Sequence, residues 1–109
     1  MGITKTEIFN EQQNRLAVTL KALAHPARIA IIQYILKQNA CICNDLVEEL
    51  GLAQATISQH LRELKNIGII KGSIAGTSVC YCIDETVWFQ IKSELNDFFG
   101  DKVSTNTCC

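Results

Sequence analysis

The stretch LGLAQATISQHLRELKNIGII, residues 50–70, combines apolar residues at helical spacing with a glycine near each end. The spacing predicts a helix over about 54–67 that buries three apolar side chains, Ile57, Leu61 and Leu64. Gly51 ends the helix before it and Gly68 ends this one, because glycine adopts the left-handed conformation at little cost. A short helix, a tight turn and a second helix with a polar outer face form the arrangement that places a recognition helix in the DNA major groove. We therefore predict a helix-turn-helix over about 45–67.

Two helices are expected before this motif. The first, over about 5–23, carries a stripe of apolar side chains, namely Phe9, Leu16, Leu20 and Leu23. His25-Pro26 breaks it, since proline disfavours a helical residue before it, and the proline suits the first turn of a second helix over about 26–38. Four side chains make one face of this second helix so apolar that we expect it to be buried: Ile29, Ile32, Ile35 and Leu36.

A β-hairpin and a further helix are expected after the motif. Isoleucines after Gly68 predict a strand, the glycine-rich GSIAGTS predicts a turn, and VCYCI alternates with period two as a half-buried strand does. The resulting hairpin, over about 69–83, would be a wing. Asp84 can cap a last helix over about 85–99, before a frayed tail. The predicted fold is a single domain over 1–109, mainly α with a small β-hairpin: a winged helix-turn-helix of about five helices.

The composition limits the class of protein. The chain has 109 residues, of which 48% are hydrophobic, as in an ordinary globular domain. No run reaches the roughly 18 apolar residues that span a membrane, and the polar N-terminus MGITKTEIFNEQQNR does not fit a secretory signal. We therefore expect a cytoplasmic protein with no membrane partner. Because that compartment is reducing, the six cysteines predict metal binding or thiol chemistry rather than structural disulfides.

The net charge of −1 gives no overall indication of a nucleic-acid partner, but the charge distribution does. Residues 54–78 carry three basic side chains against one acidic, whereas residues 84–101 carry five acidic against one basic. Polar side chains on the predicted recognition helix can reach base edges or phosphates: Gln54, Thr56, Ser58 and Gln59. Arg62 and Lys65 are better placed for phosphates, and four residues would line the wing: Lys71, Ser73, Thr77 and Ser78. The order of elements disfavours the alternative of a solvated helix beside a polar hairpin.

Three segments carry a family pattern. They are KALAHPARIAIIQYI (21–35), CICNDLVEELGLAQATISQHLRELKNIGII (41–70) and GTSVCYCI (76–83). In order and spacing they resemble the ArsR/SmtB family of metal-responsive winged-helix repressors, over about residues 14–92. The matching features are an L-x-H/D-P-x-R second helix, a C-x-C-D-L-type sensor segment, an L-x-x-S-x-x-H-L-x-x-L recognition helix and a short wing. The family usually has Ser or Thr where Ala53 stands, so an N-cap hydrogen bond of about 1 kcal/mol is expected to be missing.

The resemblance implies a homodimer that binds double-stranded operator DNA, blocks transcription, and lets go when a metal or metalloid binds. Apolar side chains of the first and last helices are expected to pair across a two-fold axis: Phe9, Leu16, Leu20, Trp88, Leu95, Phe98 and Phe99. We expect no enzyme, no catalytic residue and no obligatory cofactor. A thiol enzyme needs a base beside its cysteine, and neither histidine lies near a cysteine in the sequence.

The sequence leaves the role of Arg28 in the HPAR segment open. Arg28 has either a structural or DNA-phosphate role, or is a surface arginine whose aliphatic stem covers a helix. His25 and His60 are not expected to bind metal. We expect His60 to pack or hydrogen-bond near the DNA face.

Cys41-Ile42-Cys43 occupies the sensor position of the arsenic-responsive members that the chain resembles. Thiolates select thiophilic ions, and the resemblance favours As(III) over Cd(II), Pb(II) or Zn(II). Cysteines at i and i+2 share a face on an extended segment but not on a helix, so the pair chelates well only if residues 40–44 are extended or lie at a frayed helix start. The family's ligand sets are incomplete in this chain. Leu46 stands where the arsenic prototype has a third cysteine, the N-terminus lacks the cysteines of cadmium-type members, and residues 84–99 lack the histidines of zinc-type members.

Two other cysteine pairs can complete the site. In winged helices the segment before the third helix often forms a short strand that pairs with the second wing strand, which would bring Cys41 and Cys43 near Cys80 and Cys82. The tail offers a pair that can reach over, also from the other subunit: Cys108 and Cys109. The alternative for each of these pairs is the absence of any role, as small residues on a sheet face or in a terminus.

Two other functions remain open on the same fold. A thiol-redox or reactive-sulfur sensor would control DNA binding by joining two thiols as a disulfide. A regulator without an effector would use only the recognition helix and the wing. Anaerobic addition of As(III), Cd(II) or Pb(II) separates a metal sensor from a redox sensor through sulfur-to-metal charge-transfer absorption.

Overall fold

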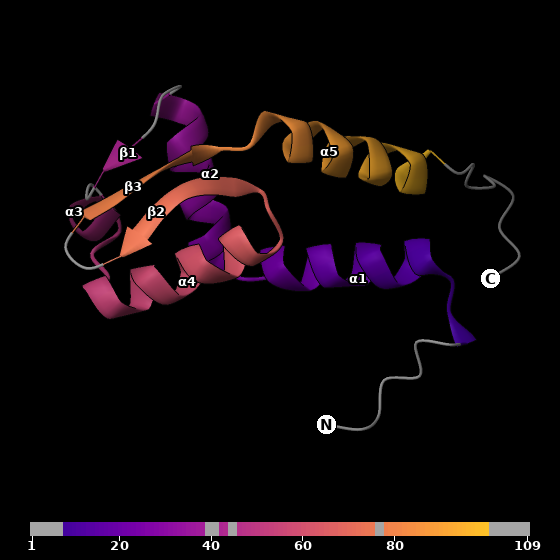
Figure 1. Ribbon diagram of the computed structural model, residues 1–109, viewed down its shortest axis with the longest axis horizontal. Helices are drawn as coiled ribbons and strands as arrows, with labels where there is room; N and C mark the ends of the chain where they lie inside the picture. The colour runs from indigo at the N-terminus through magenta and orange to yellow at the C-terminus, as the bar shows by residue number, and fades with distance from the viewer. Residues whose placement is uncertain (1–7, 39–41, 44–45, 76–77, 101–109) are drawn as a thin grey trace, which may run out of the picture.

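The helices and strands follow the predicted order. The computed structural model describes residues 8–38, 42–43, 46–75 and 78–100, with 42–43, 73–75 and 78–79 described by their backbone alone. Figure 1 shows the elements in chain order: α1 (Glu11–Leu23), α2 (Pro26–Gln38), β1 (Ile42–Cys43), α3 (Leu46–Leu50), α4 (Gln54–Asn66), β2 (Ile70–Ala75), β3 (Ser78–Ile83) and α5 (Glu85–Phe99). The prediction of a mainly helical fold with a small β-hairpin is confirmed.

α1 begins later than predicted. The apolar stripe indicated a helix from about residue 5, but the helix begins at Glu11. The Asn10 side chain accepts a hydrogen bond from the Gln13 N–H at 2.7 Å, and the Gln13 side chain accepts one from the Asn10 N–H at 3.0 Å. This reciprocal capping box fixes the start of the helix. Phe9 therefore precedes α1, is 50% exposed, and does not belong to the helical stripe.

α2 begins at Pro26, as predicted, but only part of its apolar surface is buried. Three isoleucines are almost fully covered: Ile31, Ile32 and Ile35. Ile29 and Leu36 are 48% and 43% exposed, so the expectation that they would be buried is wrong. The reason is that α3, α4 and β3 pack on one side of α2, whereas Ile29 and Leu36 border an open groove toward α1 and α5.

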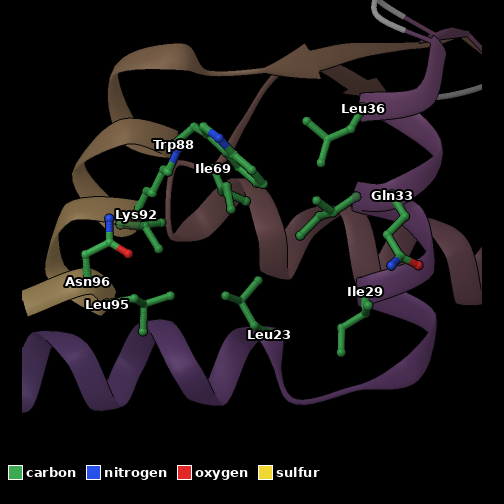
Figure 2. Close-up of a pocket in the computed structure, with 11 residues that line it drawn as sticks. Leu23, Ile29, Gln33, Leu36, Ile69, Trp88, Lys92, Leu95 and Asn96 are labelled. Carbon is green, nitrogen blue, oxygen red and sulfur yellow. The ribbon is translucent and has the colours of Figure 1, made fainter. Parts of the chain in front are cut away.

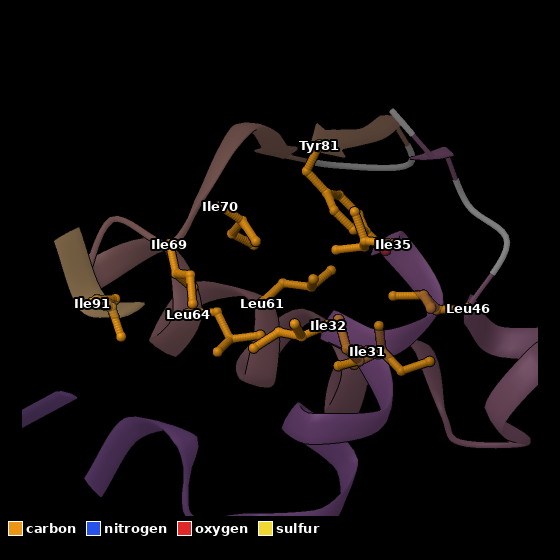
Figure 3. Close-up of a cluster of buried hydrophobic side chains, with 11 residues drawn as sticks. Ile31, Ile32, Ile35, Leu46, Leu61, Leu64, Ile69, Ile70, Tyr81 and Ile91 are labelled. Carbon is orange, nitrogen blue, oxygen red and sulfur yellow. The ribbon is translucent and has the colours of Figure 1, made fainter. Parts of the chain in front are cut away.

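The hydrophobic core lies between α2, α4 and the sheet (Figure 3). α4 contributes the three side chains predicted to face inward: Ile57, Leu61 and Leu64. Tyr81 of β3 points from the sheet toward Ile35 and is 1% exposed. Leu46 of α3 and Ile91 of α5 extend the cluster at its two ends. Because full burial of such a side chain stabilises a fold by about 1.5–3 kcal/mol, this core holds α4 firmly in place.

The sheet is antiparallel with the strand order β1-β3-β2. β2 and β3 form the predicted hairpin, and β1 adds a short third strand in which Cys43 pairs with Cys80. The expectation that the segment before α3 pairs with the second wing strand is confirmed for residues 42–43. Gly72 has φ +136°, and a Cβ there would lie 2.1 Å from the Cys80 carbonyl oxygen, so the close approach of β2 to β3 requires glycine.

α5 returns along α1 after the sheet (Figure 1). Asp84 caps it as predicted, accepting a hydrogen bond from the Val87 N–H at 3.2 Å. The Arg15 Nε donates to a carboxylate oxygen of Glu94 at 2.9 Å, which ties α1 to α5. Within the described residues, no helix combines the length and apolar character needed to cross a membrane.

Candidate nucleic-acid interface and cysteine site

α3 and α4 form the predicted helix-turn-helix. α3 ends at Leu50, and the Gly51 N–H donates to the Val47 carbonyl at 2.9 Å with Gly51 at φ +66°. Ala53 is the N-cap of α4 and supplies no side-chain hydrogen bond, which confirms the missing cap expected from the sequence. The tight turn and the buried apolar face of α4 together fix which side of the helix faces solvent.

The outer face of α4 carries most of the residues predicted to contact DNA. Four of them are exposed, and they are Gln54, Thr56, Gln59 and Arg62. Ser58 is partly buried. The Gln59 side-chain amide donates to the Glu63 carboxylate at 3.3 Å, a pair on consecutive turns of the exposed face. The polar face can therefore supply donors and acceptors to a major groove without disturbing the core.

The wing lies beside the C-terminal half of α4. The Lys65 Nζ donates to the Gly72 carbonyl of β2 at 2.7 Å, so the lysine predicted to contact phosphate also ties the recognition helix to the wing. Lys71 is exposed on β2. Ser73 lies on β2 opposite Cys80, and its side chain is not described; Thr77 lies outside the described residues. The sequence did not indicate the Lys65–Gly72 bond, because it depends on how the hairpin packs on α4.

A second polar group lies on the buried side of α4. The Arg28 Nε donates to His60 Nδ1 at 3.1 Å, and its Nη1 donates to the Ala22 carbonyl at 3.0 Å. The His25 ring lies 4.4 Å from the His60 ring, centroid to centroid. Burial lowers the pKa of His60, and the nearby His25 and Arg28 lower it further. Arg28 therefore has a structural contact. His60 packs and hydrogen-bonds as expected, but its expected place near the DNA face is wrong, because its side chain is buried against α2.

The cysteines of β3 lie on the face of the strand opposite its buried residue. Cys80 is exposed and Cys82 partly buried, while Tyr81 between them is in the core. Cys43 is the direct partner of Cys80 across the β1–β3 ladder, so the structure brings one predicted sensor position and one wing cysteine together. Three other candidates lie outside the described residues: Cys41, Cys108 and Cys109.

The sequence left the state of the wing cysteines open, since a metal sensor needs free thiols and a redox sensor joins them as disulfides. Cys80 and Cys82 are each part of a disulfide bond in the structure. In the described part of the chain, no three or more side chains of His, Cys, Asp or Glu are grouped so that they could hold a metal ion. The described residues thus show the paired strands on which a thiol site can form, and the cysteines of β3 are oxidised.

An apolar groove that the sequence did not reveal lies between α1, α2 and α5 (Figure 2). Its volume is about 440 Å³. Leu23, Ile29 and Leu36 line it together with Trp88 and Leu95, which are partly buried. The last two were expected to pair across a dimer axis, and in the single chain they face this groove.

Comparison with known proteins identifies the family. Residues 25–71 match the family described as "Bacterial regulatory protein, arsR family". The chain is 36% identical over 80 residues to the HTH-type transcriptional regulator NmtR of Mycobacterium tuberculosis, covering 73% of this chain and 66% of NmtR. It is 34% identical over 84 residues to MJ1325, an uncharacterized HTH-type transcriptional regulator of Methanocaldococcus jannaschii, covering 75% of this chain and 93% of that protein.

Solved structures share the fold. HlyU from Vibrio cholerae matches with a TM-score of 0.62 at 24% identity, over 85% of this chain and all of HlyU. The chain spans just under two thirds of the length of NmtR but almost the whole of MJ1325. Residues 25–71, which match the family, contain α2, the helix-turn-helix and the start of the wing. The chain therefore belongs to the ArsR family of bacterial regulatory proteins.

Proposed function

We propose that this protein is a cytoplasmic transcriptional repressor that binds double-stranded operator DNA as a homodimer and releases it when a thiophilic ion binds its cysteines. The observation that carries the proposal is the exposed polar face of α4, which a buried apolar face holds in place and a β-hairpin follows. Membership of the ArsR family supports it independently.

α4 would enter the major groove through its exposed face. Gln54, Thr56 and Gln59 can reach base edges, and Arg62 can reach a phosphate. Lys71, Ser73 and Thr77 of the wing would contact the phosphate backbone of the DNA. Lys65 can serve phosphate only in part, since its ammonium group already donates to the Gly72 carbonyl. Base contacts would come from the N-terminal half of α4, and phosphate contacts from Arg62 and the wing. Different residues would therefore read the sequence and position the protein on the DNA.

A dimer is supported by apolar side chains that the single chain leaves exposed. On α1 these include Leu20, which is 40% exposed, and on α5 they are Phe89, Phe98 and Phe99, of which Phe99 is 75% exposed. Large exposed apolar patches mark interaction sites. α1 and α5 lie side by side, so a second copy can cover both helices and set two recognition helices about 34–36 Å apart.

The effector site would include the cysteines of the paired strands β1 and β3 and the cysteine just before β1. β1 is extended at Cys43, which is the backbone geometry that an i, i+2 cysteine pair needs in order to chelate. Cys41 and Cys43 would supply two thiolates to As(III), or to Cd(II), Pb(II) or Zn(II). Once their disulfides are reduced, Cys80 and Cys82 would add sulfur ligands from β3. The tail pair Cys108 and Cys109 is the other source of a third ligand.

Ion binding would change the orientation of the recognition helix. Residues 42–43 lie just before α3, and only residues 51–53 separate α3 from α4. The two side chains share a face on an extended segment, but their Cα atoms are about 6.6 Å apart, so the two sulfur atoms must move toward each other to bind one ion. This movement would shift the segment, and the short connection would transmit the shift to α4. In a dimer, small rotations of both recognition helices would change their spacing and break their register with successive major grooves.

A redox-sensing repressor is the second candidate, and the disulfides at Cys80 and Cys82 favour it. Oxidation of two thiols forms one S–S bond and releases two protons and two electrons. A peroxide can accept them, giving two molecules of water from hydrogen peroxide. The disulfide would join β1 or another segment to β3 and fix the wing in one position.

Titration of fluorescent promoter DNA from the protein's own gene tests the proposal. We expect reduced protein to bind this DNA at least about a thousandfold more tightly than random DNA at physiological salt. Equal affinity for the two DNAs would contradict a sequence-specific repressor. Anaerobic As(III) and hydrogen peroxide, added separately to the complex, then distinguish an ion sensor from a redox sensor by which of them releases the DNA.

A further inference from the structure

A polar cluster joins the recognition helix to the beginning of α2, away from both the DNA face and the cysteines. His60 lies on the buried side of α4 and is 8% exposed. Arg28 holds it from α2 through a 3.1 Å hydrogen bond, and the same guanidinium holds the end of α1 through the Ala22 carbonyl at 3.0 Å. The His25 ring packs against the His60 ring, with the two ring planes tilted by 54°. One arginine thus connects three helices.

The bond between Arg28 and His60 requires a neutral histidine. A guanidinium group stays protonated in proteins and can only donate, so His60 Nδ1 must offer a lone pair. A proton on Nδ1 turns this acceptor into a donor. It also adds a positive charge directly beside the guanidinium, in a site that is mostly closed to water. Protonation of His60 at Nδ1 is therefore incompatible with the contact.

We propose that the Arg28–His60 hydrogen bond is a proton-sensitive positioning contact for the recognition helix, broken when His60 is protonated. With the bond intact, α4 is fixed to α2 and its outer face is oriented for the major groove. With the bond broken, α4 shifts on the core and the repressor loses affinity for its operator. This inference rests on the proposed DNA-binding function, to which it adds control by pH.

The surroundings of His60 set the direction of the response. Burial lowers its pKa first, and the charges of His25 and Arg28 lower it further, so the neutral form and the contact are present at pH 7. On α4 itself, Arg62 is exposed and Glu63 accepts a hydrogen bond from Gln59. Apart from Arg28, the described charged side chains on the other elements that pack against α4 are exposed, among them Lys21, Lys37, Glu48, Glu49 and Lys71. No described carboxylate is therefore bonded to the ring to stabilise a proton on it.

The expected response is opposite to that of simple electrostatics. The chain has two histidines, and histidine is the side chain whose ordinary pKa lies between pH 5 and 8. Acidification from pH 7.5 to 5.5 adds positive charge to the protein, which by itself strengthens binding to DNA phosphates. A loss of affinity over this range therefore indicates a change in the position of α4.

DNA binding provides the first test. His60→Asn keeps an oxygen acceptor near the place of Nδ1 and cannot be protonated, and His25→Asn is the matched control. Between pH 7.5 and 5.5, at constant salt and fixed thiol state, we expect wild type and His25→Asn to lose affinity for the promoter DNA by at least about fivefold. The affinity of His60→Asn, compared with its own value at pH 7.5, should not fall over this range. An equal loss in wild type and His60→Asn would overturn the proposal.

NMR provides a second test that does not depend on DNA. In wild type, the amide resonances of α4 should shift with the same midpoint as the His60 imidazole, and Arg28→Ala should abolish the coupled shift. If α4 does not respond while His60 titrates, the proposal is wrong even where DNA binding is intact. If no variant binds promoter DNA at pH 7.5, the proposed function fails, and the NMR titration still decides whether the contact positions α4.

Discussion

Cys43 and Cys80 are direct partners across the antiparallel β1–β3 ladder. Direct partners in such a ladder have Cα atoms about 4.5–5.5 Å apart. The last cysteine before α3 and the first cysteine of the second wing strand therefore belong to one place in the fold, although 36 residues lie between them in the sequence. A change in bonding at this place acts on α3 and the wing together. α3 contacts α4 directly, and the wing contacts α4 through β2.

The wing should be sensitive to a methyl group at Gly72. In Gly72→Ala the new Cβ would lie 2.1 Å from the Cys80 carbonyl oxygen, and φ is +136°. We expect the free energy of unfolding to fall by at least ~2 kcal/mol. Gly51→Ala is the control, because its φ of +66° is strained but nothing lies within 4 Å of its Cβ. It should lose only ~1 kcal/mol. Urea unfolding measures both, and equal losses would mean that the close contact is unimportant.

Base readout and phosphate contact should separate between α4 and the wing. Gln59→Ala removes an exposed amide from the recognition helix and should lower discrimination between promoter and random DNA. Lys71→Ala removes an exposed charge from β2 and should weaken binding to both DNAs alike. Affinities for both DNAs, measured at several salt concentrations, check the assignment. A change of specificity alone in Lys71→Ala would show that the assignment is wrong.

The exposed aromatic side chains of α5 should mediate assembly. Phe98 and Phe99 are 54% and 75% exposed in the single chain. We expect a dimer in light scattering at micromolar concentration, and we expect Phe98→Ser with Phe99→Ser to shift the equilibrium toward monomer. Lys92→Ser, an exposed position on the same helix, is the control and should leave the mass unchanged. A wild-type monomer at micromolar concentration would contradict the proposed interface.

Stability should fall in acid because of His60. Its pKa is lowered in the folded chain, mainly by burial, whereas in the unfolded chain it is near 6.5. Below pH 6.5 the unfolded state therefore binds more protons than the folded state, so stability is fully present above that pH and declines as pH falls toward the folded pKa. Urea unfolding at pH 7.5 and 5.5 should show a larger loss for wild type than for His60→Asn. Parallel losses would indicate that His60 is not the group responsible.

Much of the fold could be predicted because its boundaries depend on local signals. Pro26 begins α2, Gly51 and Gly68 end α3 and α4, and Asp84 caps α5, each through its own backbone or side-chain preference. The start of α1 was missed because an apolar stripe continued past a capping box that begins at Asn10. The prediction followed the apolar periodicity, whereas the capping box sets the start of the helix.

The expected burial of α2 failed for a different reason. Helical periodicity shows which side chains share a face, but not which neighbouring elements cover that face. Ile29 and Leu36 lie on a part of α2 that borders the groove, so they stay about half exposed. Only the positions of α1 and α5 decide this, and these are set by contacts far apart in the sequence.

The candidate site was predictable to the same extent. The exposed polar face of α4 follows from its 3.6-residue period, which also identified the buried Ile57, Leu61 and Leu64. The bonds from Arg28 to His60 and from Lys65 to Gly72 join different elements, and no local pattern reveals them. The pairing of Cys43 with Cys80 was predictable only from the way winged helices place the strand before the third helix.

The most direct test of the account is the effect of a thiophilic ion on DNA binding by wild type and by Cys41→Ser with Cys43→Ser. Fluorescence anisotropy with promoter DNA, on reduced protein under anaerobic conditions, measures the affinity with and without As(III). We predict that As(III) lowers the affinity of wild type by roughly 5–150-fold, and that the double variant binds DNA as wild type does without responding to the ion. A full response in the double variant would contradict the account and place the sensor at Cys80 and Cys82 or in the tail.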